Sequence, residues 1–253
     1  MERISIISLI YQSIEYAEFL YDNIRRHTPE LGTWDAEFFF VANDATPEVL
    51  AFLKEKKYPH YININPVYSD EDRFDKGFGF PEYMGRVYMG YNYGMRMARS
   101  PIITLVSSDN CFSPHWLHNL KKRLTHANVV SPRMIQPCWF MNPTNGSECE
   151  IIDFGTGVKS FQDVAFQERV KEIREDSTSI GNAFMPLMIY KDNARLVGYY
   201  PLGNLHDGDY NKIKSFGDQE FYKRLAELGI EHITSNDSII YHFNEGEKYL
   251  KVE

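Results

Sequence analysis

Residues 105–116 read LVSSDNCFSPHW: a short apolar run leads directly into a polar cluster, and a helix start follows. The preceding residues 102–106, IITLV, are β-branched or leucine, which is typical of a strand buried on both faces of a parallel sheet. Ser107, Ser108 and Asp109 therefore stand where this strand leaves the sheet. A carboxylate at that place needs water, a cation or a ligand that carries one, so Asp109 is a candidate functional residue.

Strands and helices alternate through the first half of the chain. Thr46 is placed as a helix N-cap, with Pro47 at the first helical position. The predicted strands are 4–10, 36–42, 61–65 and 102–106, and the predicted helices are 14–27, the segment from Pro47, 82–99 and 113–124. This βαβα order predicts an α/β fold with a mostly parallel central sheet flanked by helices.

The second half of the chain is less regular. Strands are predicted at 129–139, 183–190 and 238–243, a hairpin at 150–158, and helices at 163–175 and 216–229, the last closed by Gly229. No repeat, low-complexity segment or linker interrupts the chain. We therefore expect one domain, 1–253, with a nucleotide-binding type of first half, 1–125, and a variable second half, 126–253.

Charge and hydropathy exclude some classes of function. The formal net charge of −8 argues against non-specific binding to nucleic acid, because such binding relies on Lys and Arg beside phosphates. The apolar run near the N-terminus is too short for a transmembrane helix, and it lacks the basic start and cleavage site of a signal peptide. We therefore expect a cytoplasmic protein with no transmembrane segment.

Polar side chains follow the predicted strands or open a predicted helix. They are Tyr11 after the first strand, Asn43 and Asp44 after the second, Ser107, Ser108 and Asp109 after the fourth, Asp218 at a helix start and His242 in the last strand. In open α/β sheets, ligands bind outside the carboxyl ends of the strands, so these residues are the candidates for a site.

Each candidate also has a purely structural explanation. Asp44 can cap a turn before its helix, and Asp218 suits a helix N-terminus because of the helix dipole. A lone histidine such as His242 is more often a buried structural residue than a ligand. The order of the set along the chain, rather than any one member, favours a functional site.

The ordered set resembles an inverting glycosyltransferase of the GT-A fold, of the family-two type. The family's opening SIIIPTYN resembles SIISLIYQ, and its VDDGSTD after the second strand resembles VANDATPE. Its RNxG element resembles YNYG at 91–94, and its DADD…P.WL resembles SSDNCFSPHWL. Its EDxDLxxRLxxxG resembles GDQEFYKRLAELG, and its late histidine resembles the one in IIYHF. The resemblance runs from Ile4 to His242.

The resemblance implies a divalent cation, Mn²⁺ or Mg²⁺, bound to the diphosphate of the donor. Asp109 matches the last aspartate of the family's D-x-D triplet, whereas Ser107 replaces the first and removes one anionic ligand. Asp109, His242, the diphosphate oxygens and water would then form the metal site, because oxygen-rich ligation suits these two ions.

The resemblance also implies a donor, an acceptor and a catalytic base. It places a nucleotide-sugar donor, UDP-linked by this interpretation, at Tyr11, Asp44, Asn92, Ser108 and Asp109. Asp44 matches the residue that contacts the nucleobase, and Asp218 matches the base that takes a proton from the attacking hydroxyl of a glycan or other acceptor. The half 126–253 would then hold the acceptor and the base.

Two other functions are compatible with parts of the pattern. A sugar nucleotidyltransferase usually carries a phosphate loop rich in glycine and lysine near the first strand, and SLIYQSIEY has neither. A non-catalytic relative that binds nucleotide sugars or glycans is favoured by Ser107. Turnover of a donor sugar, with and without metal, separates these alternatives.

Overall fold

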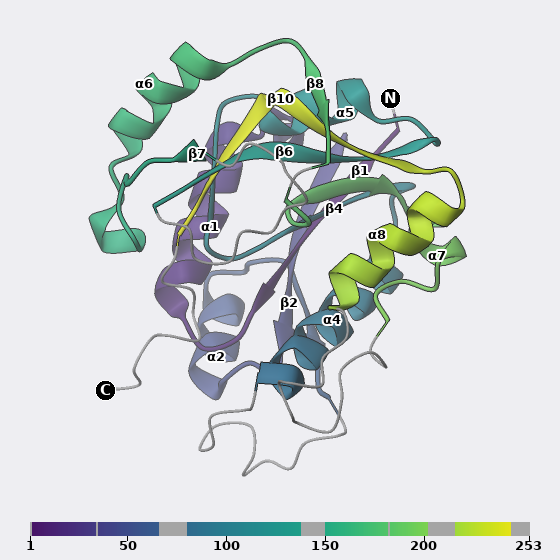
Figure 1. Ribbon diagram of the computed structural model, residues 1–253. Coiled ribbons are helices and arrows are strands. Elements are labelled where there is room, and N and C mark those ends of the chain that lie inside the picture. The colour runs from purple at the N-terminus through teal and green to yellow at the C-terminus, as the bar shows by residue number, and fades with distance from the viewer. Residues whose placement is uncertain are drawn as a thin grey trace.

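The computed structural model describes residues 2–33, 35–65, 80–137, 150–181, 183–201 and 216–243. Within these ranges, one ten-stranded sheet has the order β3-β2-β1-β4-β9-β6-β10-β5, with β7 beside β6 and β8 beside β10 (Figure 1). The strands are β1 Ile4–Ile10, β2 Ala36–Asn43, β3 His60–Asn63, β4 Ile102–Val106, β5 Asn110–Phe112, β6 Asn128–Gln136, β7 Glu150–Ile151, β8 Thr178–Ile180, β9 Leu187–Tyr190 and β10 Glu231–His242. The helices are α1 Ile14–His27, η1 Pro29–Gly32, α2 Pro47–Glu55, α4 Phe80–Met97, α5 Trp116–Arg123, η2 Val158–Ser160, α6 Asp163–Ile173, α7 Lys191–Leu196 and α8 Gly217–Glu227.

The sheet is mostly parallel, as the alternation of strands and helices predicts. β1 pairs in parallel with β2 and β4, and β2 pairs in parallel with β3. β9 is inserted antiparallel between β4 and β6, and β6 pairs in parallel with β10. Strands from the first and second halves of the chain therefore belong to the same sheet, and β1, β2, β4 and β10 end at the same edge.

Successive side chains of the central strands enter two cores on opposite faces of the sheet. Ile6 of β1 and Phe40 of β2 pack with α1, α2, α5 and α6. Ile7 and Val41, one residue further along the same strands, pack with α4, α7 and α8. This alternation explains the continuous apolar runs in the sequence, because both faces of each strand are covered. Each buried side chain of this size contributes about 1.5–3 kcal/mol.

Four predicted elements after residue 112 differ from the structure. The strand predicted at 183–190 begins only at Leu187. The predicted hairpin at 150–158 is instead the short strand β7, which pairs in parallel with β6. The predicted helix at 113–124 begins only at Trp116, because His115 has a left-handed backbone with φ 64°. The Ser113 hydroxyl accepts a hydrogen bond from the Ile239 amide at 3.2 Å, which ties the residues before the helix to β10. The last strand begins at Glu231 rather than at 238.

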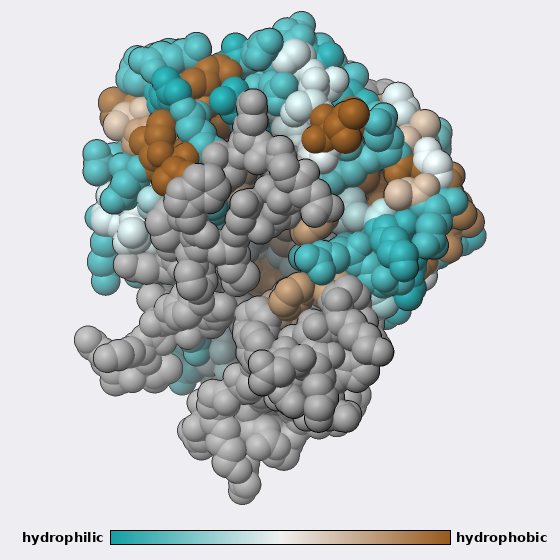
Figure 2. Space-filling view, viewed as in Figure 1, coloured by the Kyte–Doolittle hydropathy of each residue, from teal (hydrophilic) through white to brown (hydrophobic). Residues whose placement is uncertain are grey.

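The most exposed large apolar side chains of the described residues lie apart from one another. Figure 2 shows isolated brown groups among teal ones on the face in view. The most exposed large apolar residues include Val164, Ile180 and Leu196, which lie on three different elements. Scattered apolar residues of this kind are normal on a globular protein. In the described ranges, no helix combines the length and apolarity that spanning a membrane requires.

His232 in β10 predicts a loss of stability in mild acid. Its Nε2 lies 2.8 Å from the Ser131 hydroxyl, its ring packs 4.2 Å from the Tyr222 ring, and burial lowers its pKa to about 4. The unfolded chain takes up this proton below about pH 6.5, so folding stability is full above that pH and falls as the pH drops toward 4. The expected loss from His232 between pH 7 and pH 5 is about 2 kcal/mol.

Urea unfolding of the wild type and of His232→Gln at pH 7 and pH 5 tests this prediction. The variant is expected to lose less stability than the wild type over this interval, because glutamine does not titrate. An equal loss in both proteins would mean that His232 is protonated in the fold.

Candidate functional site

The carboxyl ends of β1, β2, β4 and β10 bring the predicted site residues to one edge of the sheet. Tyr11 follows β1, Asp44 follows β2, Asp109 follows β4 and His242 is the last residue of β10. Asn110 of β5 pairs directly with His242 in the antiparallel ladder, and the Phe243 amide donates to the Asp109 carbonyl at 3.0 Å. The β5–β10 pairing thus positions Asp109 beside His242.

Asp109 and His242 form an ion pair at this edge. His242 Nε2 lies 3.4 Å from Asp109 Oδ2, and the side chains are 31% and 12% exposed, respectively. Burial alone raises the pKa of Asp109, but the adjacent His242 and the Ser107 hydroxyl outweigh burial and lower it below its ordinary value. Burial alone lowers the pKa of His242, but the Asp109 carboxylate outweighs burial and raises it above 6.5. Without a cation the charged pair is therefore favoured, and a cation could bind His242 only after the imidazole releases its proton.

Each side chain of this pair also has one buried polar atom that the pair does not use. Asp109 Oδ1 and His242 Nδ1 are buried and have no hydrogen-bond partner in the structure described here. A buried polar atom without a partner costs free energy, so water, an ion or a ligand at these two atoms would relieve that cost.

The donor atoms at this edge fit a divalent cation that other molecules help to coordinate. Within the described ranges, no three His, Cys, Asp or Glu side chains gather at one point. Asp109 and His242 supply two ligand groups, and the Ser107 hydroxyl stands in the same turn. Mg²⁺ and Mn²⁺ usually take six ligands, with several from water or a bound phosphate, so two protein ligands fit a shared cation.

Asp44 is the centre of a buried polar network. Its backbone is left-handed, with φ 51°, and its side chain is fully buried. Oδ2 accepts hydrogen bonds from Arg86 Nε at 3.0 Å, from an Arg86 terminal nitrogen at 2.9 Å and from the Asn65 amide side chain. Oδ1 accepts from the Asn65 backbone amide at 2.8 Å. Both carboxylate oxygens thus hold protein groups, and the base contact expected of Asp44 stays a prediction.

Arg86 connects this network to Tyr11. Its guanidinium lies 5.4 Å from the centre of the Tyr11 ring, and its backbone carbonyl accepts from the Asn43 side chain at 3.0 Å. A Cβ on Gly90, one turn further along α4, would lie 2.7 Å from Asn43 Cγ. Glycine at 90 is therefore needed for the close approach of α4 to the end of β2.

Asn92 and Ser108, which are also expected to bind the donor, differ in their burial and contacts. Asn92 is buried, and its amide donates to the Tyr200 carbonyl at 2.8 Å while accepting from the Tyr200 amide at 2.9 Å. In this structure its side chain holds the segment after α7 against α4. Ser108 is half-buried in the turn beside Asp109. The donor contacts of both residues stay predictions.

Asp218 opens α8, as its sequence context predicts. Its Oδ1 accepts from the Gln219 amide at 2.8 Å, and burial raises the pKa of the carboxyl above its ordinary value. Glu220 points along a different face and pairs with Arg224 at 3.2 Å. Phe221 and Leu225 are the buried stripe, with no exposed surface. Asp218 and Glu220 thus have different partners, and the role of Asp218 as a base stays a prediction.

Side chains of α4 contact several of the candidate site residues. The sequence analysis did not identify these α4 residues. Arg86 holds Asp44 after β2, and the Tyr91 hydroxyl donates to the Val106 carbonyl at the end of β4 at 2.9 Å. Tyr88 lies next to Asp218 at the start of α8. The signal available in the sequence was a single arginine in the tyrosine-rich stretch GRVYMGYNYG.

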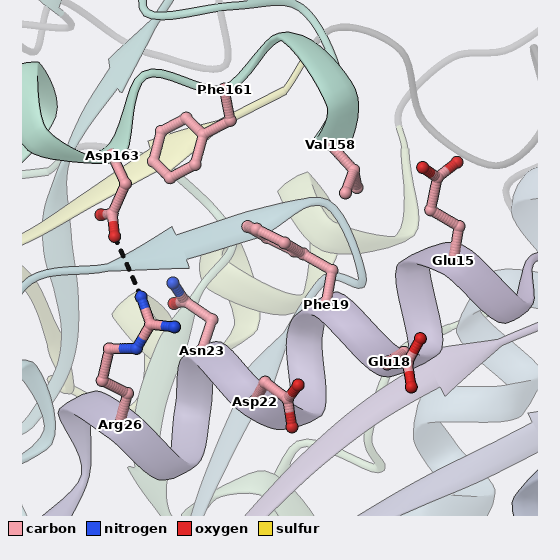
Figure 3. A pocket seen from close by; sticks show the side chains of 9 residues that line it. All are labelled: Glu15, Glu18, Phe19, Asp22, Asn23, Arg26, Val158, Phe161 and Asp163. Atoms are coloured by element: carbon pink, nitrogen blue, oxygen red, sulfur yellow. Dashed lines mark hydrogen bonds and ion pairs between the residues drawn. The ribbon is translucent and has the colours of Figure 1, made fainter.

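A separate hollow of about 480 Å³ lies between α1 and the segment that leads into α6 (Figure 3). Its lining residues are Glu15, Glu18, Phe19, Asp22, Asn23, Arg26, Val158, Phe161 and Asp163. Arg26 and Asp163 pair across it at 3.1 Å, and none of the predicted site residues lines it. The hollow is therefore separate from the candidate site at the strand ends.

Solved structures match this chain, although no protein-family model and no curated protein matches it. The first, GalNAc-T7 with UDP, GalNAc and Mn²⁺, has a TM-score of 0.60 at 11% identity, over 98% of this chain and 45% of that chain. The mannosyltransferase PcManGT from Pyrobaculum calidifontis, in complex with GDP-Man and Mn²⁺, has a TM-score of 0.55 at 14% identity. The match covers 95% of this chain and 56% of that chain. Residues 1–349 of S. aureus TarS have a TM-score of 0.55 at 14% identity, over 95% of this chain and 60% of that chain. The chain spans about half the length of these structures, and the likeness shows a shared fold.

Proposed function

We propose that this chain, which has the GT-A fold, is a glycosyltransferase that transfers a sugar from a nucleotide-diphosphate sugar to a hydroxyl group. The observation that carries the proposal is the Asp109–His242 pair at the strand ends, with one unpartnered buried atom on each side chain. Two of the similar structures hold a nucleotide or nucleotide sugar together with Mn²⁺, which supports a donor and a cation at this edge.

The proposed reaction assigns the proton to Asp218. The acceptor oxygen attacks the anomeric carbon from the face opposite the diphosphate, so the configuration inverts. The bond from that carbon to the diphosphate oxygen breaks, and its electron pair leaves with the diphosphate. Asp218 takes the proton of the attacking hydroxyl, and a pKa raised by burial brings this base nearer to the working pH. When bound, a divalent cation held by Asp109 and His242 would neutralise charge on the leaving diphosphate.

The proposed donor is UDP-linked, with its base near Tyr11 and the end of β2. Arg86 and the Asn65 side chain are held in fixed positions by the Asp44 carboxylate, and Tyr11 lies against the guanidinium of Arg86. Such preorganised polar groups discriminate bases, because an unmatched base leaves buried donors or acceptors unpaired. Ser108 and Asp109 would lie at the diphosphate, and the second half of the chain would hold the acceptor.

A screen of UDP- and GDP-linked sugars, each with Mn²⁺, Mg²⁺ or EDTA, tests the function. We expect release of UDP from a UDP-sugar, faster with metal, and a thermal shift that corresponds to about 2.7 kcal/mol at a ligand concentration one hundred times the dissociation constant. Binding without turnover would favour a non-catalytic relative, which Ser107 supports by removing an anionic ligand. Absence of any binding would refute the proposal.

Asp109→Asn is expected to weaken the metal-dependent part of donor binding at least about tenfold. The amide keeps the shape of the carboxylate but loses the charge that attracts the cation. Calorimetric titration of UDP with and without Mn²⁺ measures the metal-dependent part of the binding free energy. Asp192→Asn, an exposed change on α7 that alters net charge equally, is the control and should leave it unchanged. If Mn²⁺ increases the affinity for UDP equally in the wild type and in Asp109→Asn, Asp109 is not a metal ligand.

A further inference from the structure

The start of α8 has an unusually tight contact with α4. A Cβ on Gly217 would lie 2.6 Å from Tyr88 Cε2 and 2.8 Å from the Pro201 carbonyl oxygen. Glycine at 217 therefore lets the first turn of α8 rest directly on the hydroxyl-bearing end of the Tyr88 ring. The residue before this turn, Phe216, has no polar side-chain atom with which to cap the helix.

The Tyr88 hydroxyl is buried at this contact and has no hydrogen-bond partner in the described part of the chain. It lies next to the Asp218 carboxylate and the backbone amides of Gly217 and Asp218. Oδ1 of Asp218 accepts a hydrogen bond from the Gln219 amide of the same helix. A buried phenol beside a carboxylate is a hydrogen-bond donor whose natural acceptor is that carboxylate.

The aromatic cluster behind Tyr88 fixes the direction of its hydroxyl. Its ring centre lies 5.2 Å from that of Tyr200, which in turn lies 4.7 Å from Phe221 of α8. Asn92 holds the backbone of Tyr200 with two hydrogen bonds. Tyr88 is 1% exposed, so its ring has no space in which to turn away from Asp218.

We propose that Tyr88 is a positioning residue that orients the Asp218 carboxylate and stabilises its charged form by donating a hydrogen bond to it. The kinetic consequence rests on the proposed transferase function, whereas the effect on Asp218 itself does not. Tyr88 stays a neutral donor, because burial and the Asp218 charge raise its own pKa.

The titratable groups that face Asp218 among the described residues are phenols. Besides Tyr88 they are Tyr200 and Tyr222, and burial raises the pKa of both. Burial raises the pKa of Asp218, and Tyr88 counteracts this rise. Removal of the Tyr88 hydroxyl should therefore raise the Asp218 pKa further, by about one to two units, as expected for a hydrogen bond to a charged group.

Tyr88→Phe and the matched control Tyr222→Phe test the proposal. Tyr222 also faces Asp218, but its hydroxyl donates to the Phe184 carbonyl at 3.0 Å, so Tyr222→Phe removes a buried phenol near Asp218 without removing a hydrogen bond to it. Titration of ¹³C-labelled aspartate carboxyls by NMR, with Asp218→Asn to assign the signal, gives the pKa directly. We expect an upward shift in Tyr88→Phe and none in Tyr222→Phe.

The pH profile of kcat/KM should show the same difference if the chain is a transferase. In Tyr88→Phe the acidic limb should move upward by the same amount, with turnover at pH values well below that limb about 10–100-fold lower and the donor KM unchanged. An unchanged Asp218 pKa in Tyr88→Phe, or equal shifts in both variants, overturns the proposal. If the phenylalanine variant does not fold, 3-fluorotyrosine at 88, a stronger donor, should lower the Asp218 pKa. A wild type with no turnover refutes the transferase function but leaves the NMR result decisive for Tyr88.

Discussion

Asp218→Asn is expected to lower turnover of the donor sugar by about 10²–10⁴-fold while donor binding stays nearly unchanged. This corresponds to about 3–5 kcal/mol of barrier, because the amide cannot take the proton of the acceptor hydroxyl. Asparagine keeps the shape of aspartate, and its side-chain oxygen can still accept from the Gln219 amide. The stability of α8 should therefore barely change, which separates catalysis from folding.

Glu220→Gln is the matched control for this experiment. It removes the other acidic side chain of the first turn of α8, but Glu220 pairs with Arg224 on a different face. Its turnover should stay close to that of the wild type. Turnover of Asp218→Asn near the wild-type value would mean that Asp218 only caps the helix. A large loss in Glu220→Gln would assign the base to that residue instead.

The strands and helices of the first half were predictable because each carries a strong local signal. β1, β4 and α1 have the bounds that apolar runs and helical spacing predict, and Thr46 caps α2 as expected. β5 was missed because its three residues are held by pairing with β10 rather than by any local pattern. The early start of β10 has the same cause, since its polar residues are fixed by parallel pairing with β6.

The site was predictable to the extent that it follows strand ends. The rule that parallel strands end at one edge places Asp44, Asp109 and His242 at the same edge of the sheet without any structural information. The contacts of Arg86 and Tyr88 were not predictable, because they depend on how α4 crosses that edge. Spacing along a helix shows which residues share a face, but the strand that this face meets is set by tertiary packing.

Arg86→Met is expected to destabilise the fold by about 3–5 kcal/mol. Asp44 is fully buried, and Arg86 is the cation that neutralises its carboxylate with two hydrogen bonds. Loss of that cation leaves a charged oxygen in a site of low dielectric constant, where the Asn65 amides remain as neutral donors. Methionine fills a similar volume, so the loss should come from the unpaired charge rather than from a cavity. Urea unfolding at pH 7 measures the change in the free energy of unfolding.

Two comparisons identify the unpaired charge as the cause. Asp44→Asn combined with Arg86→Met removes both charges, so the double variant should be more stable than Arg86→Met alone. Arg26→Met breaks the Arg26–Asp163 pair, in which the arginine side chain is 62% exposed, and should change stability by less than about 1 kcal/mol. If the double variant is no more stable than Arg86→Met, packing of α4 on β2 causes the loss. The Asp44–Arg86 pair then contributes little, and the proposal that it preorganises the base-binding end loses its support.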